Sequence, residues 1–277
     1  MNLGHYNTMR IARFTDHGTV LEGDGEEILM PKKYTRPDQK PGDEVQVFVY
    51  RDQNDRLVAT TEHPYAEVGQ FAYLRVAWTN RYGSFMDWGL TKDLFVPFRE
   101  QQHHFMKDKS YLIYIYIDER TGRIVGTSKL DRNLSVEFPD VSEGEEVDIL
   151  VWKKTDLGYK VIVNNAYEGL IYNSEIFRPV TIGLQLQAIV KCVRPDGKID
   201  ITLQHTGRQL VDDVSKQLLA ALEANDGFLP YGDHTSPDVI AVQFHTSKKA
   251  FKRSLGALYR QHMITIEPEG IRLNVTD

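Results

Sequence analysis

Residues 144–175 read GEEVDILVWKKTDLGYKVIVNNAYEGLIYNSE, and this stretch says the most about the architecture. Between its first glycine and the one at position 158, apolar and polar residues alternate, which is typical of a half-buried β-strand. The same separation of 14 residues recurs in three glycine pairs, Gly4 with Gly18, Gly69 with Gly83, and Gly144 with Gly158. A fixed internal spacing indicates one structural unit repeated three times.

Each repeat contains five strand-like runs. Two shorter β-rich runs follow the glycine-bounded strand, and after a polar turn a long strand, a tight turn and a short strand predict a hairpin. Five antiparallel strands in about 60 to 70 residues are typical of a small OB-fold barrel, whereas a sandwich usually needs about seven. We therefore expect three tandem five-stranded OB-fold barrels at residues 1–65, 66–138 and 139–206.

After Gln204 the pattern changes from a strand period to a helix period. Apolar residues recur at helical spacing within residues 210–225, and Ser236-Pro237 is a typical helix start. A third helix, capped by Thr246 or Ser247, and then a strand hairpin complete the order. This order predicts a winged helix-turn-helix domain at residues 207–277. The expected fold class is mainly β with a C-terminal α+β domain.

Composition and charge limit the function classes. Of the 277 residues, 41% are hydrophobic and 10% aromatic, which is enough for packed cores. The net charge of -6 gives no chain-wide attraction for nucleic acid, so any such binding must use local faces. Without a signal sequence or a run of about 18 apolar residues, we expect neither secretion nor membrane spanning. The single cysteine, Cys192, cannot form an internal disulfide, which predicts a cytoplasmic location.

The chain shows no motif of a catalytic or metal site. Walker, GxGxxG, GxSxG, HExxH and CxxC patterns are all absent from the sequence. The adjacent His103 and His104 would point apart on any regular element, so we interpret them as a loop pair rather than as metal ligands or a catalytic base. We expect no catalytic residues, no cofactor and no metal.

The third repeat is similar to ribosomal S1-type RNA-binding domains. Its GYKVIVNNAYEGLIYNSEIF at residues 158–177 resembles the family pattern of glycine, aromatic residue and EGLxHxSE, with Tyr172 in place of the histidine. The second repeat keeps Gly83-Ser84-Phe85, similar to the Gly-Ala-Phe of that family, and we align Val96 with the histidine. The first repeat is the most divergent, with Val20 at the aromatic position and Met30 at the histidine position.

The resemblance implies candidate RNA-binding residues. S1-type barrels stack unpaired bases on aromatic side chains while Lys and Arg contact phosphates. The candidates in the second repeat are Phe85 by the motif, Trp88 and Phe95 by proximity to it, and Arg123 at the end of the final hairpin. The candidates in the third repeat are Tyr159, Lys160, Tyr172 and Lys198.

The alternative for any of these aromatic residues is burial in a barrel core, because alternate residues of a barrel strand face inward. Trp88 and Phe95 are the most open to that interpretation. In YLIYIYI at residues 111–117, the isoleucines share one face, which turns Tyr114 and Tyr116 outward to stack bases or to cover a domain joint.

The last predicted helix, at residues 246–262, is amphipathic and basic. No acidic residue occurs from Val239 to Ile266. The third helix of a winged helix domain enters a DNA major groove, so we expect a nucleic-acid contact here, with a solvated face or a surface docked on the acidic barrels as alternatives. Gly256 in the basic stripe permits either close backbone approach or a helix-packing contact. The candidate contact residues are Lys248, Lys249, Lys252, Arg253 and Arg260.

The whole arrangement, with MRIARF at residues 9–14 and TSKKAFKRSLGALYRQHMI at residues 246–264, resembles the bacterial conserved virulence factor B family. The resemblance implies a non-enzymatic regulator of gene expression with single-stranded RNA as its partner. The residues alone predict only single-strand-binding folds and one basic helix. Two alternatives stay open. One is a DNA-binding transcriptional regulator whose barrels bind protein partners, and the other is a ribosome- or polymerase-associated adaptor.

Overall fold

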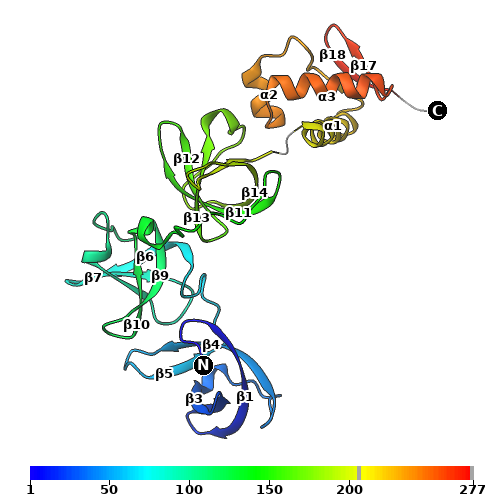
Figure 1. Cartoon of the computed structure of the whole chain (residues 1–277). Helices are drawn as coiled ribbons and strands as arrows, with labels where there is room; N and C mark the ends of the chain where they lie inside the picture. The colour runs from blue at the N-terminus through cyan, green and yellow to red at the C-terminus, as the bar shows by residue number, and fades with distance from the viewer. Residues whose placement is uncertain (205–206, 275–277) are drawn as a thin grey trace. The chain divides into compact units, whose positions relative to one another are not determined.

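The structure is a computed structural model that describes residues 1–204 and 207–274. The chain divides into two compact units, Met1–Leu134 and Ser135–Asp277. Along the chain, three closed five-stranded barrels are followed by a domain of three helices and a three-stranded sheet (Figure 1). The predicted fold class is confirmed.

The three barrels have one topology, in which the third strand closes the barrel by pairing in parallel with the fifth. A short 3-10 turn follows the third strand in each. Barrel 1 contains β1 (Tyr6–Thr15), β2 (Gly18–Gly23), β3 (Glu26–Pro31), β4 (Glu44–Arg51) and β5 (Leu57–Thr60). Barrel 2 contains β6 (Phe71–Thr79), β7 (Gly83–Asp87), β8 (Leu94–Pro97), β9 (Ser110–Asp118) and β10 (Arg123–Thr127). Barrel 3 contains β11 (Glu146–Lys154), β12 (Gly158–Val163), β13 (Tyr167–Tyr172), β14 (Gln185–Val193) and β15 (Ile199–Thr202).

The repeated glycines are explained by a close approach between the second and third strands. A Cβ atom on Gly18, Gly83 or Gly158 would lie 2.1, 2.4 or 1.9 Å from a carbonyl oxygen of the neighbouring strand. No side chain fits at such distances, so glycine is required wherever this barrel is built.

The strand register corrects the alignment of the second and first repeats with the third. Gly158 pairs with Tyr172, whereas Gly83 pairs with Pro97 and Gly18 with Pro31. Pro97 and Pro31, rather than Val96 and Met30, therefore occupy the position of the S1-type histidine. Val96 and Met30 are fully buried, because a shift of one residue along a strand exchanges the outer face for the core.

Barrels 1 and 2 share one apolar core within the first unit. Phe48 and Tyr50 of β4 pack in the same buried cluster as Trp88, and the rings of Phe48 and Trp88 meet edge to face with centroids 5.8 Å apart. The Tyr6 hydroxyl is hydrogen-bonded to His63 Nδ1 at 2.9 Å. Because side chains of both barrels are buried in this shared cluster, the hydrophobic effect holds the two barrels together.

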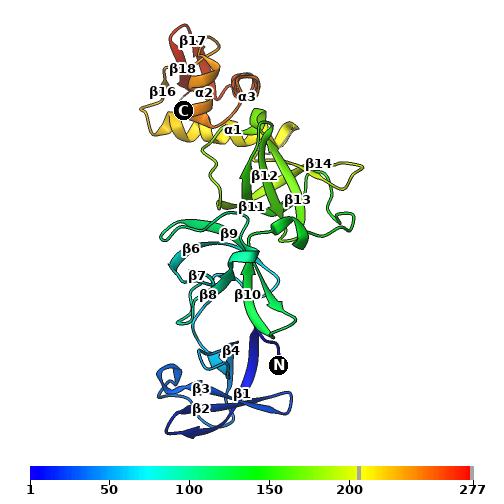
Figure 2. The ribbon, with the colours of Figure 1, turned by 90° about the vertical axis from the view of Figure 1, so that its left-hand side faces the viewer.

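The C-terminal domain has the predicted order of helix, helix, helix and hairpin (Figure 2). The Ser236 side chain accepts a hydrogen bond from Val239 N, and the side chain of Ser247, rather than Thr246, caps the third helix. The elements are α1 (Gly207–Glu223), β16 (Phe228–Leu229), α2 (Pro237–Phe244), α3 (Lys248–Arg260), β17 (Ile264–Glu267) and β18 (Gly270–Leu273). The sheet order β16-β18-β17 places the β17–β18 hairpin as the wing.

Candidate nucleic-acid interface

Barrel 2 carries a row of three aromatic rings across neighbouring strands. The register pairs Trp78 with Phe85 and Phe85 with Phe95, so the three side chains share one face of the sheet. Trp78 and Phe85 are stacked with centroids 3.7 Å apart and planes 4° apart, and the centroids of Phe85 and Phe95 are 4.9 Å apart. The three rings pack against one another and form one apolar platform, with Phe85 between Trp78 and Phe95. The ring faces left for an unpaired base are therefore those at the two ends, on Trp78 and Phe95.

An open groove of about 790 Å³ runs over this platform. Besides the rings, its wall includes Tyr82 from the β6–β7 loop and Arg123 at the start of β10. A second hollow of about 370 Å³ shares Tyr82, Phe95 and Arg123 and adds Phe98 from the turn after β8. The face made by the second and third strands, flanked by the loops after the first and fourth strands, is the surface on which OB-folds bind oligonucleotides.

Trp78 was missed by the sequence analysis because of a β-bulge. Leu74 and Val76 point into the core, and strict alternation would bury Trp78 as well. The register shifts between Val76 and Trp78, and the extra residue, Ala77, turns the indole outward. Trp78 is 44% exposed, and its indole N–H donates a hydrogen bond to Asp93 at 2.8 Å.

The expectation that Trp88 stacks bases is wrong. Trp88 is only 3% exposed and packs against Phe48 in the core shared by barrels 1 and 2. A base reaches its ring only if that core opens. Phe85 and Phe95 are half-buried in the groove, so a base-stacking role for them stays a prediction.

Charge is distributed unevenly along the groove. The smaller hollow is lined by three arginines, Arg99, Arg120 and Arg123, and by one carboxylate, Asp118. The larger one is lined by three carboxylates, Asp52, Asp55 and Asp93, and by two cations, Lys92 and Arg123. We call the smaller hollow the arginine end of the groove and the larger hollow its carboxylate end. Arginines attract phosphates at the first, and carboxylates repel them at the second.

His103 and His104 lie exposed in the loop after the 3-10 turn. The His104 ring stacks on Phe98 with centroids 5.5 Å apart, beside the arginine end of the groove. Tyr114 and Tyr116 are half-buried, while Ile113 and Ile115 are fully buried, as the alternation predicts.

Barrel 3 does not repeat the platform. Its register places Lys153, Lys160 and Leu170 where barrel 2 has Trp78, Phe85 and Phe95. Lys160 forms an ion pair with Glu168 at 2.9 Å. The predicted tyrosines are also engaged, because Tyr159 packs against the barrel core and the Tyr172 hydroxyl accepts a hydrogen bond from Arg194. Lys198 is exposed, 3.7 Å from Asp196.

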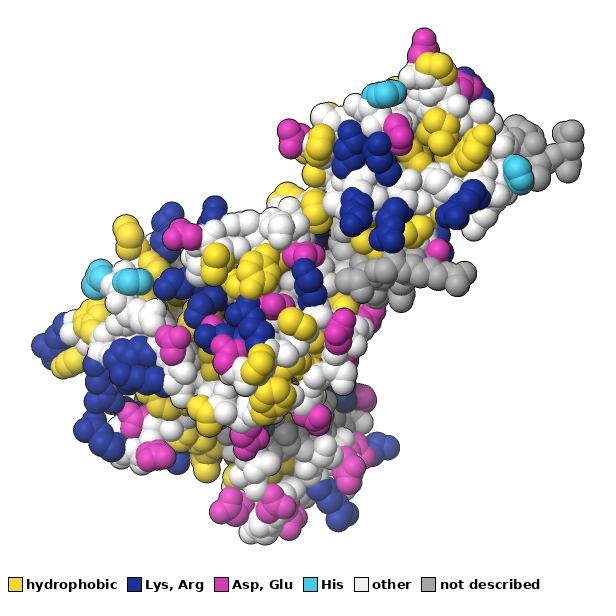
Figure 3. Space-filling view, turned by 45° about the horizontal axis from the view of Figure 1, so that its top comes forward, with side chains coloured by type: hydrophobic (Ala, Val, Ile, Leu, Met, Phe, Trp, Pro, Cys, Tyr) yellow, Lys and Arg dark blue, Asp and Glu magenta, His cyan; other side chains and the backbone are white. Residues whose placement is uncertain are grey.

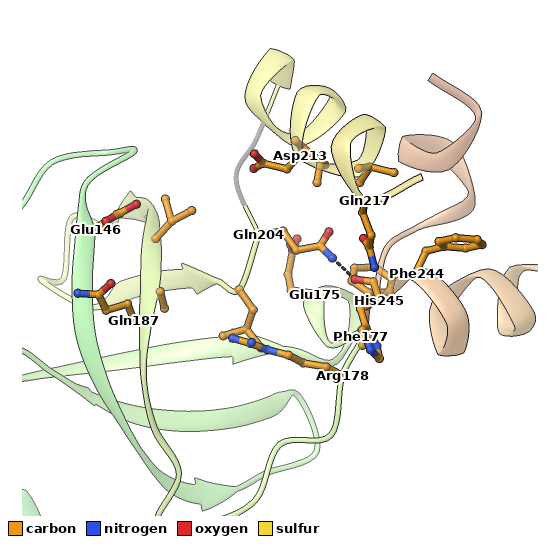
Figure 4. A pocket seen from close by; sticks show the side chains of 15 residues that line it. Glu146, Glu175, Phe177, Arg178, Gln187, Gln204, Asp213, Gln217, Phe244 and His245 are labelled. Carbon is orange, nitrogen blue, oxygen red and sulfur yellow. Dashed lines mark hydrogen bonds between the residues drawn. The ribbon is translucent and has the colours of Figure 1, made fainter. Parts of the chain in front are cut away.

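A pocket of about 350 Å³ in the second unit is lined by barrel 3, α1 and α2 (Figure 4). The Gln204 side chain reaches the backbone oxygen of His245 across it. Three carboxylates, Glu146, Glu175 and Asp213, face one arginine, Arg178. An acidic lining repels a phosphate backbone, so this pocket is not the candidate site.

The exposed face of α3 is basic. Lys249, Lys252, Arg253 and Arg260 are exposed and Lys248 is half-buried, and Lys and Arg side chains gather on this domain at the upper right of Figure 3. A Cβ atom on Gly256 would meet no described atom within 4 Å. Helix packing therefore does not explain this glycine, whereas close approach by a partner would.

Two negative findings concern the described residues. No helix among them is both long enough and apolar enough to cross a membrane. Within residues 1–204 and 207–274, no group of three or more His, Cys, Asp or Glu side chains is arranged to hold a metal ion.

Comparisons with known proteins agree with this architecture. The S1 domain family matches residues 3–62, and the CvfB-like winged helix domain family matches residues 216–273. Conserved virulence factor B of Staphylococcus aureus (strain USA300) is 25% identical over 268 residues, which cover 92% of this chain and 88% of the relative. Over nearly its whole length, this chain is therefore similar to conserved virulence factor B.

Two further likenesses span nearly the whole chain. The uncharacterized protein YitL of Bacillus subtilis (strain 168) is 29% identical over 269 residues, covering 94% of this chain and 90% of the relative. A crystal structure of a multidomain protein with nucleic acid binding domains from Streptococcus pneumoniae is 25% identical, covers 98% of both chains and has a TM-score of 0.44.

Both matched domain types are nucleic-acid-binding modules rather than enzymes, so this chain carries domains of nucleic-acid-binding types. The S1 match falls on barrel 1, where Val20 and Leu29 stand in the places of Phe85 and Phe95. The match there is to the strand framework and not to a stacking platform.

Proposed function

We propose that this chain is a non-enzymatic, cytoplasmic RNA-binding protein that regulates gene expression, with single-stranded RNA held on the aromatic platform of barrel 2. The observation that carries the proposal is the open row of Trp78, Phe85 and Phe95 beside the arginine end of the groove. Each stacked base contributes about 1 to 3 kcal/mol, and neighbouring arginines neutralise phosphates.

The platform accepts a single strand and not a duplex. Bases in a duplex are stacked on one another and paired, so their faces are not available to Trp78 or Phe95. The S1-type architecture favours RNA as the natural strand. Because every base has an aromatic face, stacking alone gives little sequence preference.

The basic face of α3 is the second nucleic-acid contact. It is in the same chain as the platform, so binding at one site raises the effective concentration of the strand at the other. A winged helix with an exposed basic third helix also favours a second candidate function, namely binding of duplex DNA through α3.

Filter binding of the full chain to labelled single-stranded RNA, single-stranded DNA and duplex DNA separates these functions. We expect the Trp78→Ala/Phe95→Ala variant to bind single-stranded RNA at least tenfold more weakly. Tyr73→Ala is the matched control, because Tyr73 is 41% exposed on β6 of the same barrel and is not among the groove residues.

The charge-reversal variant Lys249→Glu/Arg253→Glu tests α3. If the aromatic double variant binds RNA normally while charge reversal abolishes binding, barrel 2 is not the RNA site. Tight binding of duplex DNA that depends on α3 alone supports the second candidate instead.

A further inference from the structure

A loop of barrel 1 forms part of the groove on barrel 2. The turn between β4 and β5 places Asp52, Gln53 and Asp55 on the groove wall, together with Trp78, Phe85 and Phe95. The turn is well defined, because Asp52 Oδ1 accepts hydrogen bonds from the backbone N–H groups of Asn54 at 2.9 Å and Arg56 at 3.0 Å.

The loop is fastened to barrel 2. Lys92, in the β7–β8 loop, donates hydrogen bonds to the carbonyl oxygens of Arg51 at 2.9 Å and Asp52 at 3.0 Å. Burial lowers the pKa of Lys92, with the charges of Asp55 and Arg123 acting in opposite directions. Together with the core shared by the two barrels, these contacts make the loop a fixed wall of the groove rather than a loose neighbour.

Asp55 is the carboxylate of this wall that has capacity for a ligand. Both oxygens of Asp52 are occupied, because Oδ1 accepts the two backbone hydrogen bonds and Oδ2 accepts one from the Arg56 guanidinium at 2.6 Å. Asp93 accepts a hydrogen bond from the Trp78 indole. Asp55 is 42% exposed, and its contacts with Arg123 are long, at 3.4 and 3.5 Å. Asp55 Oδ1 is buried and accepts no hydrogen bond from any residue in the described part of the chain. The oxygen that remains for a ligand is therefore Oδ2, which is 3.5 Å from Arg123 Nη2.

The chemistry of a carboxylate decides which part of a strand faces it. A phosphate is repelled, and phosphates are better placed at the arginine end of the groove. A base edge that carries an amino group donates a hydrogen bond to a carboxylate, as cytosine N4 does. Uracil presents the O4 oxygen at the corresponding position, and two acceptors facing each other repel.

We propose that the β4–β5 loop of barrel 1 reads the edges of bases stacked on barrel 2, and that Asp55 selects cytosine and adenine over uracil. This inference rests on the proposed function of the platform. It assigns barrel 1, which lacks stacking rings of its own at the equivalent positions, a role in base preference.

The test compares the affinity of the full chain for 5′-labelled single-stranded oligo(C), oligo(A) and oligo(U) of equal length. We expect oligo(C) and oligo(A) to bind about tenfold more tightly than oligo(U). Asp55→Asn should reduce this preference to about twofold or less, because an amide both donates to O4 and accepts from N4. Asn also tolerates the positive φ of 64° at this position, so the turn is kept.

The matched control is Asp16→Asn, which removes the same charge from an exposed turn of barrel 1 and should leave the preference unchanged. An equal gain in affinity for all three oligonucleotides in Asp55→Asn would show that Asp55 only competes for Arg123, and would overturn the inference. A wild-type protein without base preference would overturn it too. Failure of the proposed function is separate, since it appears as normal binding by Trp78→Ala/Phe95→Ala.

Discussion

Two tryptophans of barrel 2 have opposite surroundings. Trp78 lines the groove and is 44% exposed, and Trp88 lies in the core that joins barrels 1 and 2. The sequence alone does not distinguish an exposed tryptophan on a strand from a buried one at the end of a strand. What separates them is the direction of each side chain, which a single bulged residue reverses for Trp78.

The first prediction contrasts these two residues. Trp88→Ala should cost about 3 to 5 kcal/mol of stability, because it leaves a large cavity in a shared core. Trp78→Ala should cost less than about 1 kcal/mol and weaken RNA binding about tenfold. Denaturant unfolding followed by circular dichroism measures the first effect and filter binding the second. Similar losses of stability in both variants would contradict this assignment.

The second prediction concerns Glu62, which links the two barrels. It accepts hydrogen bonds from Thr91 N at 2.8 Å and Thr91 Oγ1 at 2.6 Å, and Lys33 Nζ lies 3.5 Å away. Burial alone would raise the pKa of Glu62, but the hydrogen bonds from Thr91 and Tyr34 and the charge of Lys33 lower it overall. A carboxyl with a lowered pKa stabilises the fold above its unfolded value of about 4.3 and loses that contribution as the pH falls through its folded value.

Glu62→Gln should therefore be about 1 to 2 kcal/mol less stable than the wild type at pH 7. The difference should shrink as the pH falls below about 4. Thermal unfolding at pH 7, 5 and 3 measures it, with the exposed Glu119→Gln as control. A difference that does not change with pH would show that the charge of Glu62 is not involved.

Among the elements, α3 offers the clearest separation of stability from binding. Gly256 lies within this helix, and a Cβ atom at this position would have no atom of the described residues within 4 Å outside its own helix backbone. Gly256→Ala should raise stability by about 0.5 to 1 kcal/mol through helix propensity. If a nucleic-acid backbone approaches the helix at this point, the same change should weaken binding. Higher stability with unchanged affinity would mean that the glycine has no part in binding.

The elements themselves were largely predictable. The glycine spacing predicted the barrels because the close approach of the second and third strands excludes every larger residue at the same place in each. The helices of the C-terminal domain were predicted from apolar spacing and from Ser236-Pro237. The register of the third strand was not, because Val96 and Pro97 are both acceptable on a strand and only the pairing with Gly83 decides between them.

For the molecule as a whole, the sequence predicted which modules follow one another but not which surfaces are suited to binding. The groove combines residues from barrel 1 with residues from three stretches of barrel 2, at 78–85, 91–95 and 123–125. The position of the β4–β5 loop on the groove wall depends on contacts such as Lys92 with Arg51, and no local pattern in the sequence encodes them. Motifs found within one repeat could therefore identify Phe85 but not the wall opposite it.

The fourth prediction concerns the salt dependence of binding by the whole chain. With a net charge of -6 and few arginines at the groove, we expect a shallow dependence. A plot of log affinity against log salt concentration should have a slope of about -2 to -3, corresponding to three or four phosphates of a single strand. Filter binding at salt concentrations from about 50 to about 200 mM measures this slope. A slope near -6 would indicate that lysines outside the groove dominate binding.

The bulge that exposes Trp78 is present in all three barrels, between Ile11 and Arg13, between Val76 and Trp78, and between Val151 and Lys153. In each barrel the residue before the extra one is buried, and the residue after it is exposed. The bulge thus isolates one outward position from the interior, so that this position can change its chemistry without disturbing how the barrel packs. At this position barrel 1 presents the guanidinium of Arg13, barrel 2 the indole of Trp78 and barrel 3 the ammonium group of Lys153.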